Sequence, residues 1–85
     1  MSTKTNKKVK IVDTELPKWY DGAKYTEGDL VENPFTGEQA ILTPNELAMY
    51  DLIKGAEAFG KYDLVRKGLD WFRGANARAY MILLD

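Results

Sequence analysis

The 85-residue sequence contains no cysteine and no histidine. Without cysteine the chain can form no disulfide and offers no thiol nucleophile, and without histidine it cannot build a Ser-His-Asp triad. The usual zinc sites are excluded too, because their ligands are mostly cysteine and histidine. These absences remove most mechanisms available to small enzymes. We therefore expect a protein with no catalytic residues, metal site or cofactor.

The sequence also lacks a long apolar run. The longest, Tyr80 to Leu84, falls far short of the roughly 20 residues that span a bilayer. The lysine-rich beginning leads into no apolar stretch typical of a signal peptide. We expect no membrane partner and a cytoplasmic location.

Acidic residues could in principle supply a catalytic pair. Asp51, Glu57, Asp63 and Asp70 are the candidates, and each falls on the predicted solvent face of a helix. General acid-base chemistry needs a carboxylate in a cleft that shifts its pKa, and no such environment is predicted here. Surface solubility is the better interpretation of these four residues.

Charge is segregated along the chain although the net charge is only −1. Residues 1–10 carry four lysines and no acid, residues 11–60 carry a net charge of −7, and residues 61–85 carry +2. These segments could attract one another within a monomer or between copies. We expect a flexible basic arm over residues 1–10 and a single small domain over residues 11–85.

Two strand-like runs, Asp29–Glu32 and Gln39–Leu42, flank the sequence NPFTGE. Pro34 presets the backbone for a turn, and Gly37 can adopt the positive φ that hairpin loops often need. A phosphate-binding loop is the alternative, but it needs several glycines or a lysine before a helix. The single glycine here lies next to Glu38, so the sequence predicts a β-hairpin.

Thr43, Pro44 and Glu46 predict the start of a helix, with a capping box and proline in the first helical position. Gly60 lies where a helix end is expected. Apolar side chains recur on one face: Met49, Leu52, Ile53, Ala56 and Phe59. Leu47 and Tyr50 lie off this face, so either another part of the protein packs on their side chains or they are exposed to solvent.

A second amphipathic helix is predicted from Lys61 to Arg73. Its apolar arc comprises Tyr62, Leu64, Val65, Gly68, Leu69, Trp71 and Phe72. The helical register should break near Gly74 or Asn76, and Tyr80–Leu84 then forms a short apolar C-terminal element that must be buried on most sides. Upstream, an irregular strap should be held on the core by Trp19, Tyr20 and Tyr25. The predicted class is α+β.

The stretches NPFTGE, LTPNELAMYD, GLDWFR and AYMILLD resemble a group of small uncharacterised proteins encoded by tailed phages that infect marine cyanobacteria. The resemblance covers residues 9–85. It implies no activity and no functional residues. It does imply that the chain is a phage protein that acts in a bacterial cytoplasm or is built into a virion.

A chain that lacks a nucleophile, metal ligands and a ligand loop is expected to act by contact with a protein of the host or the phage. Some of its apolar side chains have no predicted place in the core, so self-association is also possible. The candidate contact residues are Trp19, Tyr20, Phe35, Leu47 and Tyr50. The alternative is a nucleic-acid accessory protein that uses Lys4, Lys7, Lys8 and Lys10 on phosphates. A pI near 5.4 disfavours it.

Overall fold

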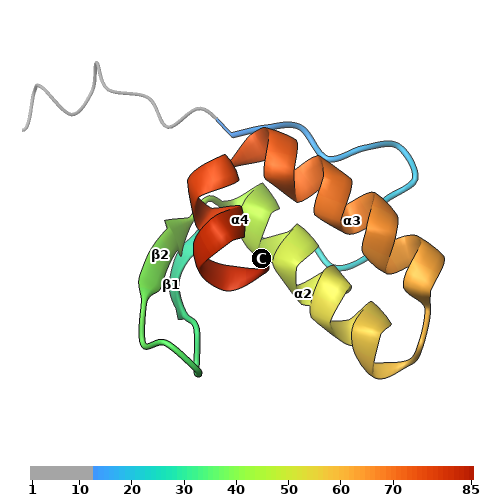
Figure 1. Cartoon of the computed structure of the whole chain (residues 1–85). Helices are drawn as coiled ribbons and strands as arrows, with labels where there is room; N and C mark the ends of the chain where they lie inside the picture. Colours follow the sequence, from blue (N-terminus) through green and yellow to red (C-terminus); the bar gives the residue numbers. More distant parts are fainter. Residues whose placement is uncertain (1–12) are drawn as a thin grey trace, which may run out of the picture.

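The structure, a computed structural model, describes residues 13–85, so the predicted basic arm lies outside the described residues. Its elements are β1 (Asp29–Glu32), β2 (Gln39–Leu42), α2 (Pro44–Ala58), α3 (Tyr62–Ala75) and α4 (Ala77–Leu83). Figure 1 shows α2 and α3 side by side, with α4 between these helices and the hairpin. The predicted small α+β domain is confirmed.

The hairpin is antiparallel, with Leu30 opposite Ile41 and Val31 opposite Ala40. Its turn is built on Asn33, whose carbonyl accepts a 2.8 Å hydrogen bond from the Gly37 N–H. The Asn33 side-chain oxygen accepts a second bond of 2.8 Å from the Phe35 N–H. Gly37 has φ 80°, the left-handed region that favours glycine. The predicted turn is confirmed.

The start of α2 is closed by a reciprocal capping box. The Thr43 hydroxyl accepts from the Glu46 N–H, and Glu46 Oε1 accepts from the Thr43 N–H. Asp13 adds a contact from the beginning of the described chain, because its carboxylate accepts from the Thr43 hydroxyl and the Asn45 N–H. The exposed donors of the first helical turn are therefore satisfied by side chains.

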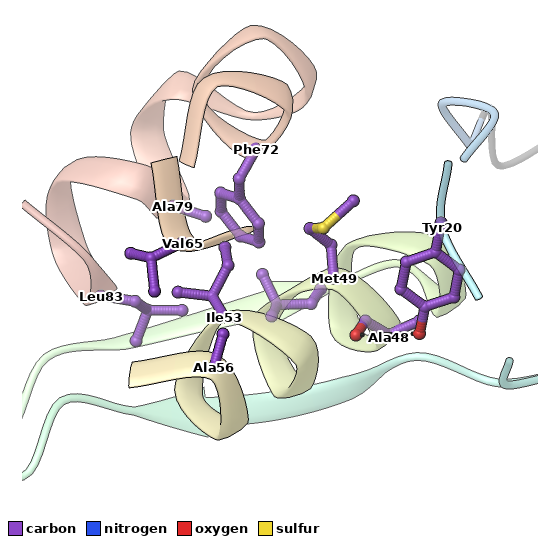
Figure 2. Close-up of a cluster of buried hydrophobic side chains, with 10 residues drawn as sticks. Tyr20, Ala48, Met49, Ile53, Ala56, Val65, Phe72, Ala79 and Leu83 are labelled. Atoms are coloured by element: carbon purple, nitrogen blue, oxygen red, sulfur yellow. Dashed lines mark hydrogen bonds between the residues drawn. The ribbon is translucent and has the colours of Figure 1, made fainter. Parts of the chain in front are cut away.

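The core lies where α2 and α3 cross. Gly68 of α3 approaches Ile53 so closely that an added Cβ would lie 2.6 Å from Cγ1 of that side chain. Figure 2 shows Met49 and Ile53 of α2 gathered with side chains of α3 and α4. The buried apolar residues are Tyr20, Leu42, Ala48, Met49, Ile53, Ala56, Val65, Phe72, Ala79 and Leu83.

Two aromatic side chains predicted to join the apolar arcs do not do so. Phe59 is 80% exposed, and Tyr62 is also exposed. Both flank Gly60, which has φ 72° and turns the chain between α2 and α3. Phe59 is the C-cap of α2 and its N–H still bonds to the Gly55 carbonyl, but the chain turns away at Gly60 and leaves its side chain uncovered by the described residues. Tyr62 stands in the first turn of α3, at the far end of the helix pair.

The predicted break in register occurs at Asn76. This residue has extended backbone (φ −154°) and serves as the C-cap of α3 and the N-cap of α4. The terminal apolar element is therefore a helix. Ala79 and Leu83 are buried, but Met81 is exposed, so the expectation of burial on most sides is wrong for Met81. A short helix packed on α3 and β2 keeps one side open.

The predicted aromatic strap runs from Asp13 to β1 and is pinned at several points. The Trp71 indole N–H donates a 3.0 Å bond to the Glu15 carbonyl, and the Tyr20 hydroxyl donates to the carbonyls of Ala23 and Ala48. In Figure 1 this segment passes along α3 and returns behind α2 to reach the hairpin. The strap thereby closes one side of the core.

Candidate protein-contact surface

The outer face of the hairpin, defined by Leu30 and Ile41, exposes paired aliphatic side chains. Leu30 is 51% exposed and Ile41 is 77% exposed, and the two residues lie directly opposite each other. Side chains alternate between the faces of a strand, so Val31 and Ala40 point the other way and pack on the core. Each face of the hairpin thus carries one pair of apolar side chains. The core covers Val31 and Ala40, whereas Leu30 and Ile41 are exposed.

A hollow of about 360 Å³ lies where this outer face meets α4. Leu30 and Ile41 line it from the hairpin, while Arg78 and Ile82 line it from the helix. The aliphatic pair therefore borders a hollow beside α4 while it stays exposed, and Arg78 lines the same hollow. Such a hollow can receive an apolar side chain of another molecule.

The tip groove is a second hollow, of about 270 Å³, defined by Pro34, Phe35, Tyr50, Lys54 and Leu84. Phe35 stands at the hairpin tip and is 95% exposed. Lys54 Nζ lies 5.7 Å from the centre of the Tyr50 ring, within the range of a cation–π contact. Lys54 Nζ also lies 3.7 Å from Glu57 Oε1, and Glu57 and Asp85 line the groove as well. The feature of the groove that is typical of contact sites between proteins is its pair of aromatic rings.

The hairpin carries charge of one sign. Residues 27–42 include Glu27, Asp29, Glu32 and Glu38 and no lysine or arginine. All four carboxylates are on exposed residues. The hairpin that carries the apolar outer face is therefore acidic, although Arg78 of α4 lies beside it, and this charge favours a partner with basic residues over an acidic one.

The structure brings two of the five predicted contact residues together. Phe35 and Tyr50 both line the tip groove. Leu47 is partly buried against the core, and Trp19 packs on the core beside Lys67, whose Nζ lies 5.5 Å from the indole centre. Tyr20 is buried, and this burial raises its pKa, with a smaller contribution from nearby carboxylates. Burial removes Tyr20 from any contact surface.

Leu30 and Ile41 were not among the predicted contact residues. Both strands carry apolar side chains on both faces, so alternation alone could not tell which face is covered. The available signal was that residues 13–85 contribute only two strands, which leaves one face of the hairpin on the core and the other open. The lysines of the alternative site, Lys4 to Lys10, lie outside the described residues.

Among residues 13–85 no cluster of three or more acidic residues could hold a metal ion. Asp51, one of the four carboxylates considered for catalysis, instead accepts a hydrogen bond from the exposed Tyr25 hydroxyl. None of the helices in this part of the chain is long and apolar enough to cross a membrane.

No protein-family model matches the chain, and neither curated proteins nor solved structures give a match. The resemblance to small phage proteins therefore stays a prediction.

Proposed function

We propose that the chain is a non-enzymatic protein-interaction domain that binds its partner through the outer face and tip of the hairpin. The observation that carries the proposal is the exposure of Leu30, Ile41 and Phe35 on one 14-residue element, Asp29–Leu42. Monomeric proteins rarely leave neighbouring large apolar side chains open unless another molecule covers them.

The hairpin is held firmly enough to present these side chains in a fixed arrangement. The Asn33 side-chain amide donates a 2.8 Å bond to the Ile82 carbonyl near the end of α4. The Asn33 side-chain oxygen also orders the turn by accepting from the Phe35 N–H. A turn whose backbone is already ordered loses less conformational entropy on binding, so Phe35 is presented as an aromatic anchor on an ordered turn.

The proposed setting is a phage infection, in which the partner is a host protein in the bacterial cytoplasm or another component of the virion. The acidic hairpin favours a partner with basic residues around an apolar pocket. Contacts between exposed charges mainly accelerate association and weaken with salt, whereas burial of Phe35 and Ile41 should supply most of the affinity.

The test is a tagged pull-down from lysate of a cyanobacterial host and of infected cells, run with and without nuclease, comparing the native sequence with Phe35→Ala and Ile41→Ser. Phe59→Ala is the matched control, because Phe59 is similarly exposed but lies at the end of α2, away from the hairpin. All three substitutions change exposed side chains, so the fold should persist.

We expect a stoichiometric protein that is retained by the native sequence and by Phe59→Ala, and is lost with both hairpin variants. Equal retention by all four proteins would reject the hairpin as the contact surface. Retention that disappears with nuclease, and on removal of residues 1–8, would instead establish the nucleic-acid alternative.

A further inference from the structure

The tip groove brings aromatic rings, carboxylates and a lysine together from distant parts of the chain. Its lining includes Pro34 and Phe35 of the hairpin turn, Tyr50, Lys54 and Glu57 of α2, and Leu84 and Asp85 after α4. The three α2 residues follow one line along the helix, because positions four and three apart lie on the same face. The groove therefore depends on how the hairpin, α2 and the end of α4 pack together.

The groove already holds one cation, which belongs to the chain itself. Lys54 Nζ lies 5.7 Å from the centre of the Tyr50 ring and 3.7 Å from Glu57 Oε1. Both side chains of the ion pair are 49% exposed, and exposed pairs of this kind contribute little to stability. A positive charge is thus attracted here by a ring face and a carboxylate, and the present cation can leave at low cost.

We propose that the tip groove binds an arginine side chain of the partner protein, which takes the place of Lys54. The inference rests on the proposed function, because it names the chemistry that the same surface recognises in its partner. In the complex, Glu57 and Asp85 accept hydrogen bonds from the guanidinium, and the face of the Tyr50 ring stacks on it.

Charge complementarity favours a cation as the occupant. Glu57 and Asp85 against Lys54 give the lining a net charge of −1. Glu32 and Glu38 flank the turn and are exposed, and residues 27–42 contain no lysine or arginine. A carboxylate of the partner would meet repulsion at this end of the molecule, whereas a guanidinium is attracted to it.

Arginine fits the groove better than lysine. Its planar guanidinium stacks on aromatic faces and donates two parallel hydrogen bonds to a carboxylate, whereas an ammonium acts as a point charge. Lysine would bring only what Lys54 already supplies, so the exchange would gain nothing. The aliphatic stem of arginine can lie along Pro34 and Leu84 while its charged head reaches the carboxylates.

A metal ion is a poorer occupant than an organic cation. Only two residues of the lining are carboxylates, and residues 13–85 contain no group of three or more acidic side chains placed to hold an ion. A calcium ion takes about six to eight oxygen ligands, and aromatic rings supply none. The rings of Phe35 and Tyr50 instead suit a cation that stacks.

The experiment is an NMR titration of the full isotope-labelled chain with N-acetyl-arginine amide at constant ionic strength. N-acetyl-lysine amide and the neutral N-acetyl-citrulline amide are the comparison probes, because they separate the guanidinium from charge alone and from apolar contact. We expect the arginine amide to shift the resonances of Tyr50, Lys54 and Glu57, with a Kd at least about threefold lower than that of the lysine amide. The citrulline amide should cause no saturable shift.

Substitutions of exposed residues test the exchange with Lys54. Lys54→Met removes the competing cation, so it should tighten binding of the arginine amide at least about threefold. Lys61→Met is the control, because it removes the same charge outside the groove, and it should not tighten binding. Glu57→Gln should weaken binding at least about threefold, whereas Glu27→Gln, an equal change outside the groove, should leave it unchanged.

Equal affinity for the arginine amide and either comparison probe would overturn the proposal. So would equal affinity of the Lys54→Met and Lys61→Met variants for the arginine amide, or an affinity that Glu57→Gln leaves unchanged. If no amide binds although Phe35→Ala and Ile41→Ser still lose the partner in the pull-down, this inference falls and the proposed function stands. If the arginine amide binds as expected but the pull-down shows equal retention, the arginine site stands and the proposed function falls.

Discussion

The side-chain amide of Asn76 donates a 3.1 Å hydrogen bond to Oε1 of Glu46. The same oxygen accepts from the Thr43 N–H at 3.0 Å, so one buried carboxylate joins the start of α2 to the corner between α3 and α4. The Asn76 side-chain oxygen meanwhile accepts from the Ala79 N–H at 3.0 Å and caps α4. Residues far apart in sequence thereby fix where the terminal helix leaves α3.

Replacement of Asn76 by alanine should lower the free energy of unfolding by about 1–3 kcal/mol, because α4 loses its cap and buried Glu46 loses a donor. Urea denaturation measures the change. Arg66→Ala is the control, since its pair with Asp63 is exposed and separated by 3.6 Å, and it should cost less than about 0.5 kcal/mol. Equal destabilisation by the two variants would contradict a structural role for the Asn76 contact.

Thr43→Val keeps the shape of the side chain but removes the hydroxyl that accepts from Glu46 and donates to Asp13. We expect a loss of about 1–2 kcal/mol, the usual range for a helix N-cap. Thr43→Ser retains the hydroxyl and should stay within about 0.5 kcal/mol of the native sequence. Thermal unfolding followed by circular dichroism separates these cases, and a Ser variant as unstable as the Val variant would show that the cap is not the cause.

Gly68→Ala tests the close approach of α2 and α3. The new methyl group would lie 2.6 Å from Cγ1 of Ile53, so the helices must move apart, at a cost of about 1–3 kcal/mol. Gly74→Ala offers the opposite case on the same helix, because no atom lies within 4 Å of its added Cβ. Alanine there should stabilise the helix by up to about 1 kcal/mol. Chemical denaturation should therefore give opposite signs for the two variants.

The elements that could be predicted from sequence are those fixed by neighbouring residues. The capping box of Thr43 and Glu46 spans four residues, and the Asn33 turn closes over five. The break at Asn76 was visible because continued helix would have turned apolar residues toward charged ones. In each case local hydrogen bonding or side chain periodicity decides the conformation, so the sequence carries the information within a few positions.

The contacts that escaped prediction join distant parts of the chain. Nothing near Asp13 indicates that it caps α2, and nothing near Asn33 indicates its bond to Ile82. The candidate contact surface has the same limitation. Phe35 was predicted to lie in the turn and to be a contact residue, but its meeting with Tyr50 in one groove depends on how the hairpin packs against the helices.

The Tyr25–Asp51 contact gives a prediction that depends on pH. The hydrogen bond to Asp51, reinforced by the negative charge of that carboxylate, raises the pKa of Tyr25 above its ordinary value of 10.0. Because the folded pKa is the higher one, the contact stabilises the fold below pH about 10, and this contribution is lost as the pH rises through the folded pKa.

Asp51→Asn removes the charge, so the Tyr25 pKa should fall toward its ordinary value, as measured by NMR titration of the ring carbons. Asp21→Asn is the control, since Asp21 contributes to the raised pKa of Tyr20 but is not among the causes for Tyr25. A Tyr25 pKa that moves equally in both variants would mean that overall charge, and not the contact with Asp51, holds the proton. A shift confined to Asp51→Asn would locate the effect in the bond between the strap and α2.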